Sequence, residues 1–438
     1  MALVAAVFAA AGRHAGAVAA VQAVLDSASC ALIALLARRA ASVRAGWIAG
    51  ALAACYGPLI YFTGELVPAT PMIFALAAAL LATPVAPDAP RRRWIAAGAV
   101  WAAAILVRSE IIAALPLVAW FAGRRAARWA VLAPAALVAA SLALNFAFSG
   151  HLVPLSVGAG VNLWLGNNPL ADGVSAFLHG PLAATAQEVT ARSRDAVEAD
   201  RRFTGLALEA LRDHPLALAR LALRKLFWTF ADRELPNTCD IDWEESQSAL
   251  FHRFFPLSLG FILPLAAAGA LLLRERRQLL LLLAPAWIAL ATSVLFFTNA
   301  RFRLPLALSA LPLAAVALDR ASELLRSPRL WLVAAAGLAL AFGGFDGVRG
   351  YRIPQLDTNT GILERGAHHG ESAIRFLRLG RDGDDSDPVA WAQLAAAQEE
   401  AGLLREAAET WRRASLRLPG DLLLRQQAMR FRHRSGLR

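Results

Sequence analysis

Long apolar runs recur throughout the chain and are separated by short arginine-rich segments. A helix of about 20 apolar residues crosses the hydrocarbon core of a bilayer, because it satisfies its own backbone polar groups there. Of the 438 residues, 58% are hydrophobic, whereas soluble domains contain roughly 45–50%. The sequence therefore predicts an all-α, multi-pass membrane protein. The expected spans are residues 15–37, 46–64, 67–83, 129–148, 254–273, 278–297, 304–318 and 330–345.

The segment of residues 94–121 allows two readings. One long span would place Arg108 and Glu110 in mid-membrane and would put the arginines before and after it on opposite sides. Two short helices that meet at Arg108 keep both arginine clusters on one side, as the positive-inside rule favours. We therefore predict a hairpin whose charged tip lies below the membrane surface, because each helix is too short to reach it. An ionisable pair at that depth is a candidate functional site. The alternative is that the two side chains only pair with each other or extend to the lipid headgroups.

Five arginine clusters fall on one side of the bundle when the hairpin is assumed, at residues 38–44, 91–93, 124–128, 274–277 and 320–329. The positive-inside rule assigns that side to the cytoplasm. This placement accounts for much of the net charge of +11, so we expect no nucleic-acid partner. The tips at Glu65, at Arg108 and at residues 299–303 are then extracytoplasmic, as are the loop of residues 149–253 and the C-terminal tail.

The sequence GVNLWLGNNPLADG, residues 160–173, opens the long polar loop. The amides of Asn162, Asn167 and Asn168 offer donors and acceptors that match hydroxyl groups, and Trp164 offers an apolar plate. These residues predict a surface that binds a sugar or an acceptor. The alternative is a structured loop that only caps the bundle, since Asn and Gly also dominate ordinary turns.

The rest of the loop carries further helical patterns. Residues 183–212 predict one solvated helix, and residues 216–230 predict an amphipathic helix in the membrane interface that contacts lipid. An acidic stretch follows between Asp232 and Glu245, and we interpret it as a solvated turn because its spacing matches no metal loop. The three cysteines form no CxxC pair, so neither a metal site nor a disulfide framework is expected.

Residues 388–421 have the spacing of a tetratricopeptide unit, in which two antiparallel helices cross at small residues. The matching positions are Trp391, Leu394, Ala395, Ala407, Trp411, Ala414 and Pro419. Residues 361–379 are a candidate for a degenerate partner repeat, with Ala373 and Phe376 near the expected positions. We divide the chain into an N-terminal transmembrane bundle (1–148), an extracytoplasmic loop with an interfacial helix (149–253), C-terminal transmembrane helices (254–345), a linker or degenerate repeat (346–387) and a tetratricopeptide-like tail (388–438).

Five motifs occur together: YFTGELVPATPMIF, AAILVRSE, GNN, RKLFWTFADRE and FTNARFRLPL. In combination they resemble membrane glycosyltransferases of the GT-C superfamily, in particular bacterial proteins of glycosyltransferase family 39, the protein O-mannosyltransferase-like group. The resemblance covers roughly residues 1–318. It implies a GT-C-like helix bundle in the bacterial cytoplasmic (inner) membrane that transfers a sugar from a polyprenyl-phosphate donor to a glycan, lipid or protein acceptor on the extracytoplasmic face.

The resemblance also implies residue roles. Arg108, Arg301 and Arg303 would bind the lipid phosphate, because an arginine fork matches phosphate oxygens; the alternative for the last two is an interfacial anchor. Glu65 and Glu110 are the candidates for proton transfer. No cofactor is implied.

In this family the catalytic acid usually lies in the first outward loop. The opening run of this chain resembles family sequence just after that loop, so we expect the chain to begin too late to contain it, through a misassigned start codon or a truncation. A chain of that kind should bind the donor but transfer the sugar poorly. A non-catalytic scaffold that presents the tail to a protein partner is the second hypothesis, and a transporter is the third.

Overall fold

The computed structural model describes residues 2–86, 88–174, 180–236, 241–248, 257–343 and 352–435. Within these ranges the regular structure is helical, apart from one isolated bridge between Tyr56 and Leu257. Four helical segments are long and apolar enough to cross a membrane: Ala15–Ala40, Ser109–Ser149, Arg276–Leu295 and Ala300–Asp319. Four shorter helices are also apolar: Val43–Ala54, Ala69–Ala82, Leu259–Leu272 and Pro328–Phe342. The predicted all-α class with several membrane-crossing helices is therefore confirmed.

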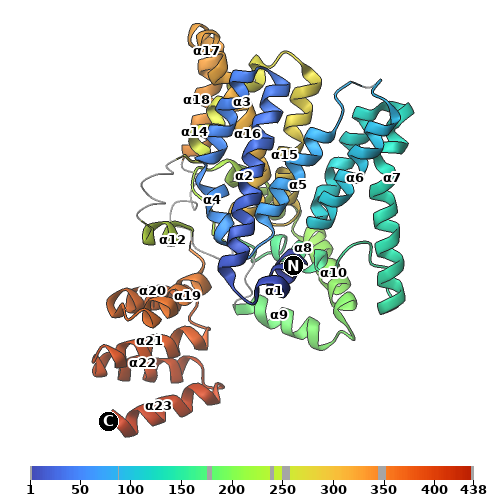
Figure 1. The fold of residues 1–438 in the computed structure, drawn as a ribbon. Coiled ribbons are helices and arrows are strands. Elements are labelled where there is room, and N and C mark those ends of the chain that lie inside the picture. Colours follow the sequence, from blue (N-terminus) through green and yellow to red (C-terminus); the bar gives the residue numbers. More distant parts are fainter. Residues whose placement is uncertain are drawn as a thin grey trace. The chain divides into compact units, whose positions relative to one another are not determined.

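The chain forms two compact units. The first comprises residues 1–174, 203–235 and 241–349, and the second comprises residues 175–202, 236–240 and 350–438. The first unit contains the apolar bundle (Figure 1). Its smaller helices are α1 (Ala2–Ala11), α8 (Ala159–Gly166), α12 (Ile241–Gln247) and α17 (Ala321–Arg326).

Helix α16 (Ala300–Asp319) forms the centre of the bundle, and most of its residues are buried. It packs against α2 (Ala15–Ala40), α3 (Val43–Ala54), α14 (Leu259–Leu272) and α15 (Arg276–Leu295). At Gly269 a Cβ atom would lie 1.8 Å from the carbonyl oxygen of Leu313, so α14 and α16 touch backbone to backbone. Large apolar side chains such as Trp47 and Phe148 remain exposed on the outer helices, as expected where a bundle faces lipid.

The chain reverses direction at Arg108. Helix α6 (Arg91–Val107) ends there, the 3-10 helix η1 (Ser109–Ala114) forms the tip, and α7 (Leu115–Ser149) bends at Gly123, where φ is 67°. Arg277 at the start of α15 donates a hydrogen bond of 2.6 Å to the carbonyl of Phe121, just before this bend. The guanidinium of Arg91 lies 3.4 Å from the ring centroid of Trp129, just after it. The predicted hairpin is therefore present, with its basic ends close together and its tip at Arg108.

Arginines at this end of the bundle bind the last carbonyls of neighbouring helices. Arg39 donates to the carbonyls of Leu80 and Leu81 in α5 (Ala69–Ala82), and Arg320 donates to the carbonyl of Leu272 in α14. Cations suit the negative end of a helix dipole. These contacts gather basic clusters that are distant in sequence at one end of the bundle. Which side of the membrane that end faces stays a prediction.

Two predicted helices are each broken in two. Residues 46–64 form α3 and α4 (Gly57–Gly64), because the chain leaves the helix at Tyr56 to bridge Leu257 and Pro58 starts the next helix. Residues 183–212 form α9 (Gly180–Ala191) and α10 (Ala196–Asp213). There the Oδ1 atom of Asp195 accepts hydrogen bonds from two backbone N–H groups and starts a new helix.

The second unit contains a series of helices near the C-terminus: α19 (Pro354–Gly366), α20 (Gly370–Gly383), α21 (Pro388–Glu400), α22 (Leu404–Arg417) and α23 (Leu422–Ser435). Each packs against the next. The pair α21 and α22 buries Trp391, Ala395, Ala407, Trp411 and Ala414 in one cluster. Ala373 and Phe376, the two positions of the candidate degenerate repeat, are buried in α20. The tetratricopeptide assignment itself remains a proposal.

Candidate functional site

A short turn between α15 and α16, residues 296–303, joins several distant segments of the first unit; we call it the hub turn. Asn299 caps α16 by accepting a hydrogen bond of 3.1 Å from the N–H of Phe302. The N–H of Thr298 donates to the carbonyl of Gly173, and the N–H of Ala300 donates to the carbonyl of Leu235. The hub turn is therefore bonded both to residues 160–173, which we call the Asn/Gly loop, and to the segment that follows α11 (Pro215–Phe230).

Lys225 of α11 holds the hub turn from a fully buried position. Its ammonium donates to Oδ1 of Asn167 at 3.0 Å and to the carbonyls of Val294 at 3.1 Å and Phe296 at 2.8 Å. A Cβ atom on Gly166 would lie 1.7 Å from the carbonyl oxygen of Phe296. The GNN motif thus approaches the end of α15 more closely than any other residue type would allow at that glycine.

The residues predicted to bind a sugar make bonds inside the protein. The amide of Asn162 donates to the carbonyl of Gly158, and that of Asn167 donates to the carbonyls of Leu163 and Leu295. The amide of Asn168 donates to the carbonyl of Trp164, whose ring is buried and lies 5.1 Å from that of Phe203. Through these contacts the loop stabilises the end of the bundle. Recognition of a sugar by the same side chains remains a prediction.

Arg303 is buried, with 3% of its side chain exposed. Its guanidinium donates to the carbonyls of Thr229, Ala231 and Arg233 and lies 3.4 Å from the carboxylate of Glu234. A lipid phosphate would have to compete with four oxygen acceptors for this fork. Arg303 therefore fixes the end of α11 against α16.

The acidic stretch after α11 is not the solvated turn that the sequence predicts, at least over Asp232 and Glu234. Oδ1 of Asp232 accepts hydrogen bonds of 2.5 Å from Ser258 Oγ and 2.7 Å from the N–H of Gly260, at the start of α14. Glu234 faces Arg303. Asp232 thus accepts hydrogen bonds at the start of a helix, and Glu234 lies beside a buried cation. The sequence of the acidic stretch alone does not identify either partner. Asp240 of the same stretch lies outside the described residues.

The hairpin tip meets the hub turn at Phe302. The guanidinium carbon of Arg108 lies 5.3 Å from the centroid of the Phe302 ring, and that of Arg301 lies 5.1 Å from it. Arg108 also forms an ion pair with Glu110, and both side chains are mostly buried. The structure thus brings two of the three predicted phosphate-binding arginines to one aromatic ring. The third, Arg303, instead makes the backbone contacts described above.

Glu65 ends α4 at the same end of the bundle. Gln22 of α2 is buried and donates to the backbone carbonyls of Thr63 and Glu65, at 3.1 and 2.7 Å. The turn that carries Glu65 is therefore bonded to α2. One helical turn further along α2 is Asp26, a buried acid that the interpretation of the sequence missed. The signal was available, because Asp26 is the only acidic residue in the predicted span of residues 15–37.

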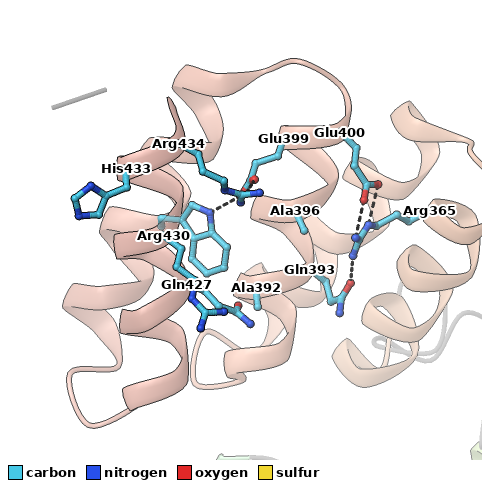
Figure 2. A pocket seen from close by; sticks show the side chains of 11 residues that line it. Arg365, Ala392, Gln393, Ala396, Glu399, Glu400, Gln427, Arg430, His433 and Arg434 are labelled. Carbon is cyan, nitrogen blue, oxygen red and sulfur yellow. Dashed lines mark hydrogen bonds and ion pairs between the residues drawn. The ribbon is translucent and has the colours of Figure 1, made fainter. Parts of the chain in front are cut away.

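The second unit carries a groove of about 860 Å³ along the helical tail (Figure 2). Two glutamates in it are already paired with arginines: Glu400 with Arg365 at 2.7 Å, and Glu399 with Arg434 at 3.1 Å. The Arg365 guanidinium lowers the pKa of the Glu400 carboxyl. Arg430 and His433 also line the groove.

Residues 1–153 match the family model of dolichyl-phosphate-mannose-protein mannosyltransferases. The matched part contains Glu65, Arg108 and Glu110 but not the hub turn. Searches of curated proteins and of solved structures found no match.

Proposed function

We propose that the chain is a GT-C-type membrane glycosyltransferase. In this proposal it transfers a sugar from a polyprenyl-phosphate donor to a glycan, lipid or protein acceptor at the extracytoplasmic face of the membrane. The observation that carries the proposal is the meeting of Arg108 and Arg301 at the Phe302 ring, in a chain whose first third matches a mannosyltransferase family.

The chemistry requires cations at this place. When the bond between the sugar and the phosphate breaks, the lipid phosphate leaves with the electron pair and gains negative charge. Two guanidinium groups can stabilise that charge through bidentate hydrogen bonds, and the partly buried position strengthens the interaction. Arg108 would exchange its Glu110 partner for the phosphate. Arg303 would keep its contacts with backbone carbonyls and so hold the hub turn in place.

The remaining sequence predictions keep their places in the proposal. Glu65 and Glu110 are the acids that the resemblance offers for proton transfer. Asn162 is partly exposed at the start of the Asn/Gly loop, and we propose it as the residue of that loop that contacts a sugar hydroxyl.

A second candidate function is a scaffold that binds a protein partner through the helical tail. The groove of about 860 Å³ between α19, α21 and α23 favours it, because stacked helix pairs bind extended partners along such faces. The glycosyltransferase must bind a lipid-linked sugar in its membrane bundle, whereas the scaffold need not.

The test is ligand binding by the full chain in lipid nanodiscs. The proposed glycosyltransferase binds polyprenyl-phosphate mannose and loses most of that affinity when the phosphate is removed from the lipid. A chain that binds neither form of the lipid, but captures a protein through its tail, would support the scaffold instead.

A further inference from the structure

The groove of the helical tail is formed by three helices that do not follow one another in the chain. Helix α21 forms its middle, and α19 and α23 form its two sides (Figure 2). The lining residues of α21, from Ala392 to Glu400, recur every three or four positions. They therefore lie on one face of that helix, which is open between the two sides. The whole groove belongs to the second unit.

Helix α23 presents basic side chains to this groove. It contains four arginines and one histidine but no acidic residue. Its apolar face belongs to the buried cluster of α21 and α22, through Leu424, Ala428 and Phe431. The face that remains open carries Gln427, Arg430 and Arg434, all of which line the groove. Packing of the apolar face thus fixes which arginines point into the groove.

Two ion pairs join the sides of the groove to its middle. Arg365 of α19 pairs with Glu400 at 2.7 Å, and Arg434 of α23 pairs with Glu399 at 3.1 Å. The two glutamates are consecutive in α21, so their side chains leave the helix about 100° apart and reach opposite sides. Both pairs are at the surface, since 58% of the Glu400 side chain and 72% of the Arg434 side chain are exposed. Exposed pairs contribute little to stability, so a carboxylate of a partner can replace either glutamate.

The groove has more arginines than carboxylates. Three arginines line it, against the two glutamates. Arg430 is exposed and forms no ion pair within the part of the chain that the structure describes. Glu399 already accepts hydrogen bonds from the indole N–H of Trp411, at 2.8 Å, and from Arg434. Because an arginine fork binds a carboxylate through two parallel hydrogen bonds, Arg430 offers a place for an acid of a partner.

The middle of the groove suits an extended main chain. Ala392 and Ala396 lie one helical turn apart on the open face of α21, and their short side chains leave room above the helix. The amide of Gln427 on α23 carries both donors and an acceptor. The amide of Gln393 on α21 accepts a hydrogen bond from Arg365 and keeps its own donors. An extended peptide has backbone donors and acceptors to match these amides, whereas a lipid phosphate has acceptors alone.

We propose that this groove binds an extended acidic segment of a partner protein. One carboxylate of the segment binds Arg430, and a second replaces Glu400 at Arg365, so the segment crosses the open face of α21. The inference rests on the proposed role of the tail as a scaffold, and it adds the chemical class of the partner. It does not depend on sugar transfer by the membrane bundle.

The test measures the dissociation constant of a fluorescent, capped peptide of alternating glutamate and alanine. The protein is the full chain in phosphatidylcholine nanodiscs, and a glutamine–alanine peptide of the same length is the neutral probe. We expect the wild-type chain to bind the glutamate peptide more tightly by roughly tenfold or more. This preference should shrink as salt rises, because the pairs are exposed.

Three variants locate the binding site. Arg430→Gln should weaken binding of the glutamate peptide by about threefold to tenfold. Arg432→Gln is the matched control, because it removes the same charge from an exposed position of α23 that does not line the groove; it should change binding little. Glu400→Gln should tighten binding, since it frees Arg365. A change that only disturbed the fold would not tighten it.

The outcomes separate this inference from the functions beneath it. Equal losses in Arg430→Gln and Arg432→Gln contradict it, because the peptide would then respond to net charge alone. A glutamine peptide that binds as tightly as the glutamate peptide also contradicts it, although the tail would still be a scaffold. If neither peptide binds but phosphatidylglycerol vesicles do, the scaffold is contradicted as well. Binding of the sugar donor, measured in the same nanodiscs, tests the glycosyltransferase independently.

Discussion

The side chains of Lys225 and Asn167 form a hydrogen bond of 3.0 Å, although 58 positions separate them in the sequence. The same ammonium donates to two carbonyls at the end of α15. One buried cation of α11 thus joins the Asn/Gly loop and the hub turn. Two of the motifs that the sequence singles out, RKLFWTFADRE and GNN, are therefore joined directly, next to the start of a third.

Replacing Lys225 with Met should destabilise the protein. The change keeps most of the apolar stem but leaves three buried oxygen acceptors without their donor, so we expect a loss of about 2–3 kcal/mol. The loss is measured as a change in the free energy of unfolding, from thermal or chemical denaturation of the protein in detergent. Arg220→Met is the control, because Arg220 is exposed on the same helix and should shift stability by no more than about 0.5 kcal/mol. Equal losses in both variants would show that Lys225 does not hold the hub turn.

Replacing Gly166 with Ala should also destabilise the protein, because the new Cβ would lie 1.7 Å from the carbonyl oxygen of Phe296. Overpacking of this kind costs about 1–3 kcal/mol. Gly205→Ala is the opposite case. No atom lies within 4 Å of its added Cβ, and the residue is inside α10, so Ala should stabilise by about 0.5–1 kcal/mol. The prediction is wrong if both substitutions shift the melting temperature in the same direction.

The helical tail should loosen in acid. The Arg365 guanidinium lowers the folded-state pKa of Glu400 below its ordinary value of 4.5. The pair therefore contributes its full stability above pH 4.5, and this contribution is lost as the pH falls through the lowered pKa. The protection of α19 and α21 against hydrogen exchange, measured in the full chain relative to the intrinsic rate at each pH, should fall over that range. Glu400→Gln should remove this part of the pH dependence; a variant with the same profile as wild type would argue against the pair as its source.

The orientation of the bundle is open to a direct check. The arginine clusters predict that the loop of residues 149–253 and the C-terminal tail are extracytoplasmic. An alkaline phosphatase fused after the last residue should then be active, and a cytoplasmic reporter at the same place should be silent. The reverse pattern would mean that at least one span is assigned wrongly.

The sequence alone predicts the helices better than the site. The eight predicted spans correspond to four long and four shorter apolar helices, because span length and apolar content are local properties. The break at Tyr56 could not be predicted, since it depends on Leu257, which is distant in sequence. Likewise, nothing near Lys225 indicates that it is buried, whereas Arg224 beside it is exposed. The start of α10 at Asp195 was predictable, because an Asp followed three residues later by a Glu is a common helix start.

In the proposed function, Arg108 and Arg301 bind a lipid-linked phosphate beside Phe302. Glu110 competes with that phosphate for Arg108, so Glu110→Gln should tighten the binding of donor. Arg301→Gln should weaken it by about tenfold or more, since a charge-assisted hydrogen bond contributes about 1.5–3 kcal/mol.

The most direct measurement is the dissociation constant of polyprenyl-phosphate mannose for the wild-type chain, Glu110→Gln, Arg301→Gln and the double variant Arg108→Gln with Glu110→Gln, all in the same nanodiscs. We expect tighter binding for Glu110→Gln and weaker binding for both variants that lack an arginine. An unchanged dissociation constant across the four proteins would contradict this expectation.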